Sequence, residues 1–109
     1  MNIMLWSIVA LTLLTANAVA GTRSHLEQAM QYSEAALYAR DGKTLVEKAE
    51  EAKQQATLAS QQRERTEGKH MEQGVQCLDN AIKEARSGNV EAARTASKDA
   101  LDHFTRAAR

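Results

Sequence analysis

One helix-period pattern occurs twice in this chain and constrains its fold more than any other feature. Between residues 69 and 86 the apolar side chains recur at steps of four, three, four and three, at Met71, Val75, Leu78, Ile82 and Ala85. At about 3.6 residues per turn they form one continuous stripe, which predicts a helix with one face in a core. The segment HLEQAMQ from His25 matches HMEQGVQ from His70, with identical residues at the same spacing. The pattern therefore indicates a duplicated helical unit.

Two further segments match one another and complete the duplication: Val46-Glu47 with Val90-Glu91, and Ala49, Ala52 and Ala56 with Ala93, Ala96 and Ala100. Helices are expected over residues 25–40, 45–60, 69–86 and 90–107, and the chain contains no proline to break them. Short turns join the helices of each pair, so sequential neighbours run in opposite directions. The predicted fold class is all-α, an up-down-up-down antiparallel four-helix bundle built from a duplicated helical hairpin.

Residues with N-cap chemistry precede the expected helices. Ser24 and Thr44 are each followed three residues later by glutamate, Glu27 and Glu47, which is the capping-box spacing. The candidate caps of the third and fourth helices are Thr66 or Gly68, and Asn89. These positions predict where each helix begins.

The expected core is small. The first helix carries its stripe from Leu26 to Arg40, and the second is mostly alanine on its core side. The large apolar residues expected inside are Leu26, Met30, Leu37, Leu45, Met71, Val75, Leu78, Ile82, Val90, Leu101 and Phe104. So little apolar volume makes a small domain marginal, and two hairpins that dimerise to complete their core are an alternative.

The first twenty residues differ from the rest of the chain. Residues 1–20 carry no charged side chain, have an apolar run over 8–14, and end Ala18-Val19-Ala20. This pattern is typical of a cleaved secretory signal peptide, with an uncleaved N-terminal anchor as the alternative. We therefore expect a signal peptide over 1–20, a four-helix bundle domain over 21–109, and no membrane association after cleavage.

Charge and motifs exclude several functions. The 14 basic residues balance the 14 acidic ones, so no net field attracts nucleic acid or an anionic membrane. The chain has no HExxH, CxxC or glycine-rich phosphate loop. A narrow alanine-rich bundle also offers no cleft for acid-base catalysis, so the protein is predicted not to be an enzyme.

Three histidines are expected at one end of such a bundle. His25 and His70 open the first and third helices, and His103 lies near the end of the fourth. Imidazoles that converge there would suit copper, nickel or zinc, and the alternative is three solvated surface histidines. The carboxylates that could complete a metal shell are Glu27, Glu72, Asp99 and Asp102.

Cys77 is the only cysteine in the chain, so no internal disulfide can form. A buried thiol, a metal ligand and an intermolecular bridge all remain open, with burial first because Cys77 borders the stripe beside Leu78. It lies about 10 Å along the helix axis from His70 and would belong to a separate layer.

A resemblance to a known family adds to these observations. The run GVQCLDNAIKEARSGNVEAARTASKDALDHF, with HLEQAMQYSEAAL and LVEKAEEAKQQATLAS, resembles the small metal-binding protein family of exported, histidine-rich four-helix bundles. The resemblance implies a periplasmic protein that binds divalent transition metals, copper especially, through repeated histidines. His25, His70 and His103 fall where the family pattern has histidine, and Cys77 offers an alternative ligand. Other residues occupy further histidine positions: Tyr32, Lys48, Gln55, Gln73, Cys77, Glu84, Asn89 and Ala96.

Two main hypotheses follow. The first is an exported protein that binds or buffers divalent transition metals, copper or else nickel or zinc, with reduced capacity, at His25, His70, His103 and Cys77. The second is a non-catalytic structural or interaction bundle that has lost metal binding. A redox-responsive homodimer bridged through Cys77 is a third possibility.

Overall fold

The computed structural model describes residues 24–62 and 64–108. They form four helices: α2 (His25–Leu37), α3 (Gly42–Gln61), α4 (Gly68–Arg86) and α5 (Val90–Ala107). The described residues contain no strand. The all-α prediction is confirmed.

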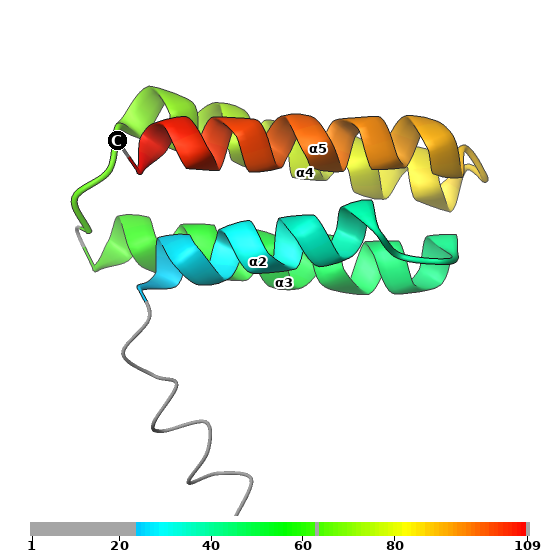
Figure 1. Cartoon of the computed structure of the whole chain (residues 1–109), viewed down its shortest axis with the longest axis horizontal. Coiled ribbons are helices and arrows are strands. Elements are labelled where there is room, and N and C mark those ends of the chain that lie inside the picture. Colours follow the sequence, from blue (N-terminus) through cyan, green and yellow to red (C-terminus); the bar gives the residue numbers. More distant parts are fainter. Residues whose placement is uncertain (1–23, 63, 109) are drawn as a thin grey trace, which may run out of the picture.

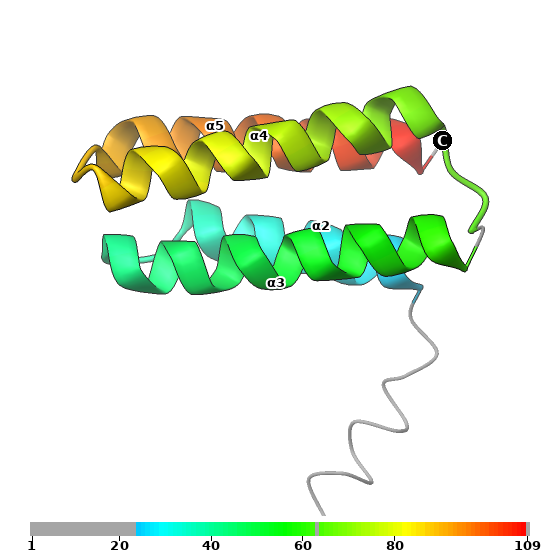
Figure 2. The same cartoon turned by 180° about the vertical axis from the view of Figure 1, so that it is seen from behind.

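The helices form two layers, each an antiparallel hairpin. The first hairpin is α2 with α3 and the second is α4 with α5 (Figures 1 and 2). Helix α2 packs on α3 and α5, and α4 packs on α5 and α3, which is the neighbour pattern of an up-down-up-down bundle. The start of α2, the end of α3, the start of α4 and the end of α5 share one end of the molecule (Figure 1).

The core consists mainly of alanine methyl groups with a few large side chains. Phe104, Leu45 and Leu78 are fully buried, and Leu26, Met71 and Ile82 are nearly so. The other expected core residues are only partly buried: Met30, Leu37, Val75, Val90 and Leu101. Two serines, Ser33 and Ser97, are also buried, and each donates its hydroxyl proton to the carbonyl four residues earlier, on Ala29 and Ala93.

Arg40 is exposed, contrary to its expected place on the core stripe. The cause is that α2 ends at Leu37, three residues earlier than predicted, with Tyr38 at the C-cap. The turn that follows buries Ala39 instead. Asp41 then begins the next helix rather than ending the previous one.

The N-caps differ from the predicted ones at two helices. Ser24 caps α2 as expected and accepts the amide proton of Glu27. Helix α3 is capped by Asp41 rather than Thr44, because the Asp41 carboxylate accepts the Thr44 amide proton at 2.7 Å and starts the helix earlier. Glu67, and neither Thr66 nor Gly68, is the N-cap of α4.

The fourth helix begins at the predicted turn. Asn89 is its N-cap, but the Asn89 side chain donates to Glu84 at 3.2 Å instead of capping the helix. Gly88 adopts a φ of 87°, which favours glycine in this tight connection. The turn is short enough to hold α4 and α5 antiparallel and adjacent.

Three polar contacts tie the connections to distant elements. Both carboxylate oxygens of Glu64, after α3, accept the amide protons of His25 and Leu26 at the start of α2, at 2.9 and 3.2 Å. An anion there also complements the positive end of the helix dipole. The Arg94 guanidinium donates to the Ala39 carbonyl, and the Glu67 amide donates to the Ala107 carbonyl. The Arg94 contact joins the two hairpins directly, and the Glu64 and Glu67 contacts hold the α3–α4 connection against α2 and α5.

The expected signal peptide, residues 1–20, lies outside the described residues. In the part of the chain that the structure does describe, none of the helices combines the length and the apolar character needed to span a bilayer.

Truncation of the core should be costly. Leu78 is fully buried, so Leu78→Ala should lower the free energy of unfolding by about 2–5 kcal/mol through lost burial and the cavity left behind. Tyr38 is 75% exposed, and Tyr38→Ala should change the free energy of unfolding by no more than about 0.5 kcal/mol. Urea titration followed by circular dichroism measures both. Equal effects would contradict the placement of Leu78 in the core.

The Asp41 cap should make stability depend on pH. The Thr44 amide proton holds the pKa of the Asp41 carboxyl below its usual value. A depressed pKa in the folded state stabilises the fold above the unfolded-state pKa and loses that effect as pH falls through the folded-state pKa. The melting-temperature advantage of wild type over Asp41→Ala should therefore be full at neutral pH and shrink as the pH falls past the ordinary carboxyl pKa of 3.8. Asp41→Asn caps without titrating, so its advantage over Asp41→Ala should stay constant with pH.

Candidate metal centre

Two of the three histidines meet at one end of the second hairpin. His70 lies in the first turn of α4 and His103 near the end of α5, so the antiparallel hairpin brings them side by side. Their Nδ1 atoms are 3.2 Å apart, and the two rings stack at a centroid distance of 5.4 Å and an interplanar angle of 29°. The separation of the two Nδ1 atoms is that of a hydrogen bond, so one Nδ1 carries the proton and the other presents its lone pair.

Glu67 holds the other side of the His70 ring. Its Oε2 lies 3.4 Å from His70 Nε2, which favours a proton on that nitrogen. Glu67 is the N-cap residue of α4 but makes no side-chain cap bond, which leaves its carboxylate available for the ring one turn later. Which of the two Nδ1 atoms donates is set by the tautomers of the two rings. A carboxylate on the far nitrogen is how proteins orient a histidine that binds a metal.

His25 lies at the same end of the bundle but in the other layer. Its Nδ1 contacts Gln55 Oε1 on α3 at 2.6 Å, and because an amide oxygen only accepts, His25 Nδ1 is the donor. Across the described residues, His, Cys, Asp and Glu side chains form no group of three or more that could hold a metal ion. The expected convergence of three imidazoles is therefore reduced to the pair His70 and His103.

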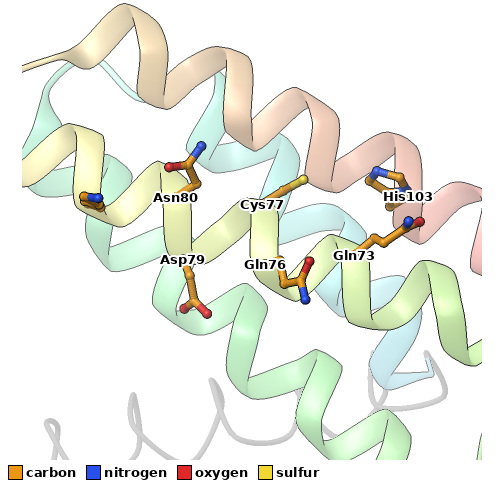
Figure 3. A pocket seen from close by; sticks show the side chains of 7 residues that line it. Gln73, Gln76, Cys77, Asp79, Asn80 and His103 are labelled. Atoms are coloured by element: carbon orange, nitrogen blue, oxygen red, sulfur yellow. The ribbon is translucent and has the colours of Figure 1, made fainter.

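Cys77 lies two turns along α4 from His70, about 10 Å away along the helix axis. The thiol is half-buried against the core and lines a shallow surface depression together with Gln73 and His103. Figure 3 shows Gln73 and Cys77 directed toward α5, from which His103 projects. Burial raises the pKa of the Cys77 thiol, and the negative charge of Asp99 raises it further. Cys77 therefore stays protonated near neutral pH, which makes it a poor ligand and a poor nucleophile.

Sequence reasoning missed two partners of the histidines, Glu67 and Gln55. The four carboxylates expected to complete a metal shell, Glu27, Glu72, Asp99 and Asp102, are all exposed. A signal for Glu67 was present, since it precedes His70 by three residues and such residues share a helix face. Gln55 is thirty residues from His25 and has no such local signal.

Residues at the expected histidine positions face one another across the hairpins. Gln55 contacts His25, the Lys48 ammonium lies 5.8 Å from the centre of the Tyr32 ring, and Asn89 donates to Glu84. His70 and His103 form the pair in which both members are histidine. Tyr32 is further held by Glu51, and burial followed by this hydrogen bond raises the pKa of the Tyr32 phenol. The fold thus pairs several of these positions, with Tyr32–Lys48 and His25–Gln55 across the first hairpin and Glu84–Asn89 at the turn of the second.

Comparison with known proteins identifies a family for the chain. No curated protein shows significant sequence similarity to the chain. The model of one protein family, described as small metal-binding protein, matches residues 1–107, which is nearly the whole chain and includes all three histidines and Cys77. A match of that extent over a four-helix bundle with a histidine pair across one hairpin shows that the chain belongs to the small metal-binding protein family.

Proposed function

We propose that this protein binds or buffers a divalent transition metal ion, and that His70 and His103 are its principal chelating pair. The observation that carries the proposal is the separation of 3.2 Å between their Nδ1 atoms. Two nitrogens about 2.0–2.1 Å from one metal ion are about 2.9 Å apart at a right angle and about 3.3–3.4 Å apart at the tetrahedral angle. The pair already lies between these values, so a metal ion can replace the shared proton with little movement of the helices.

Glu67 supports this role from outside the chelate. The Glu67 carboxylate lies against His70 Nε2, which orients the ring and leaves Nδ1 directed at the His103 imidazole. The ring that carries the shared Nδ1 proton must move it to its own Nε2, so that both Nδ1 lone pairs are free and each imidazole keeps one proton. The His70 side chain is 23% exposed, which lets an ion and its remaining water ligands reach the pair.

The preferred metal ion and the number of ions that the chain can bind are inferred from the donor atoms present. Two neutral imidazole nitrogens favour copper over nickel and zinc in the usual order of divalent affinities. Capacity is reduced because most expected histidine positions hold other residues, of which Lys48 is cationic and Ala96 has no donor atom. Cys77 is a secondary ligand at best, since binding requires loss of a proton that burial and Asp99 both retain.

The compartment is supported by the N-terminal residues. The uncharged segment 1–20 with Ala18-Val19-Ala20 at its end supports a cleaved export signal, a functional domain over 21–109 and a periplasmic location. The role proposed there is binding without catalysis. A homodimer is compatible with it but is not required by the chelate.

Metal binding should depend on two of the three histidines. In calorimetric titrations of the purified protein with Cu(II), Ni(II) and Zn(II), His70→Ala and His103→Ala should each weaken binding at least about tenfold, since even outer-shell partners contribute that much. His25→Ala is the matched control, because His25 bonds to Gln55 in the other layer, and it should bind like wild type. The metal should also raise the melting temperature of wild type and of His25→Ala. No binding and no shift in wild type would instead support a structural or interaction bundle.

One substitution should create a second site. Gln55 already contacts His25 Nδ1 at 2.6 Å, so Gln55→His should place a second imidazole pair across the first hairpin. Stoichiometry measured by equilibrium dialysis should rise from about one to about two ions per chain. Gln54→His is the matched control, because Gln54 is the exposed neighbour on α3 and the new imidazole would point away from His25. An equal rise in both variants would show that any added surface histidine suffices.

A further inference from the structure

Gly74, in the interior of α4, lies directly beneath the ring of Phe104 from α5. Both residues are buried, and Phe104 is fully enclosed. A Cβ atom at position 74 would lie 2.5 Å from Phe104 Cε1 and 2.8 Å from both Cδ1 and Cζ. Unbonded carbon atoms pack at about 3.5–4.0 Å, so the ring occupies the space that any side chain at position 74 would need.

The backbone conformation does not explain the glycine. Among the described residues, Gly88 has a positive φ and Gly74 does not. Glycine in a helix interior is also a poorer choice than alanine for helix formation. The steric requirement of the Phe104 ring therefore accounts for a small residue at this position.

The contact is adjacent to the histidine pair on both helices. Phe104 follows His103 in sequence, and Gly74 lies four residues after His70, on the same side of α4. The absence of a side chain at Gly74 therefore lets α5, with the Phe104 ring, approach α4 closely at this end. A hydrogen bond of 3.2 Å is lost when its atoms separate by a few tenths of an ångström more.

We propose that Gly74 is a positioning residue for the His70 and His103 chelate, acting through the Phe104 ring. This inference rests on the function proposed above. A side chain at position 74 displaces α5, because the enclosed ring has no free space in which to rotate. The displacement separates the two Nδ1 atoms and removes the preformed bite for a metal ion.

The test uses two Gly→Ala variants in the same helix, one beneath the Phe104 ring and one in open space. Gly74→Ala should weaken Zn(II) binding at least about tenfold and remove the nuclear Overhauser effect between the two imidazole rings in the metal-free protein. Gly68 is the first residue of the same helix and lies two residues before His70. The Cβ added by Gly68→Ala meets nothing within 4 Å. This variant should keep both the affinity and the ring-to-ring signal.

Phe104→Leu separates positioning from general stability. This variant should lower the melting temperature, because it truncates a buried ring, yet keep the imidazole contact, because nothing pushes the helices apart. The double variant Gly74→Ala with Phe104→Leu nearly conserves the buried volume and should restore the imidazole contact that Gly74→Ala loses. It therefore tests the proposal even where Gly74→Ala alone does not fold.

Each contrary result has a distinct meaning. If Gly74→Ala retains both the ring-to-ring signal and the affinity, or if the double variant folds without the signal, Gly74 does not position the pair. The same conclusion follows if Phe104→Leu loses the signal as completely as Gly74→Ala. If wild type shows the signal but binds no metal, the proposed function fails while the positioning role is still decided by the metal-free spectra.

Discussion

The close approach of paired helices is the constraint on which the rest of the structure depends. Most buried positions are alanine, so the helices meet nearly backbone to backbone, and few side chains are large enough to fix their spacing. Among residues 24–62 and 64–108 Phe104 is the largest fully buried side chain, and it fits because α4 has a glycine beneath it. Only at such a short separation can side chains that border the core, one from each helix of a hairpin, come within bonding distance.

Several such side chains form pairs across the hairpins, and Asn89 with Glu84 forms a further pair at the exposed turn of the second. The pairs differ in their chemical groups: an imidazole with an amide, an ammonium over a phenol ring, an amide with a carboxylate, and two imidazoles. The first three pairs satisfy their own polar groups and stabilise the fold locally. Two neutral imidazoles instead share a single proton between two nitrogens that a metal ion can use. The same geometry therefore serves structure in one place and supports binding in another.

Much of this could be predicted because it is encoded locally. The period of the apolar residues, the small-residue turns and the repeat of HLEQAMQ as HMEQGVQ led to four helices and to an antiparallel bundle. The placement of His25, His70 and His103 at one end follows from those boundaries alone. The start of α3 was placed too late, since Thr44 and Asp41 both have capping side chains and the pattern did not distinguish them.

The sequence by itself determined the helices and their order, because helix periodicity, capping and short connections act between residues close in the chain. Only the tertiary structure decided which histidines meet. The rotation of each helix about its axis and its register against its neighbour depend on packing between distant residues, such as Phe104 on Gly74, and these turn His103 toward His70 while His25 turns toward Gln55. Cys77 likewise became a protonated, half-buried thiol through the approach of α5 and Asp99, which nothing near it in the chain specifies.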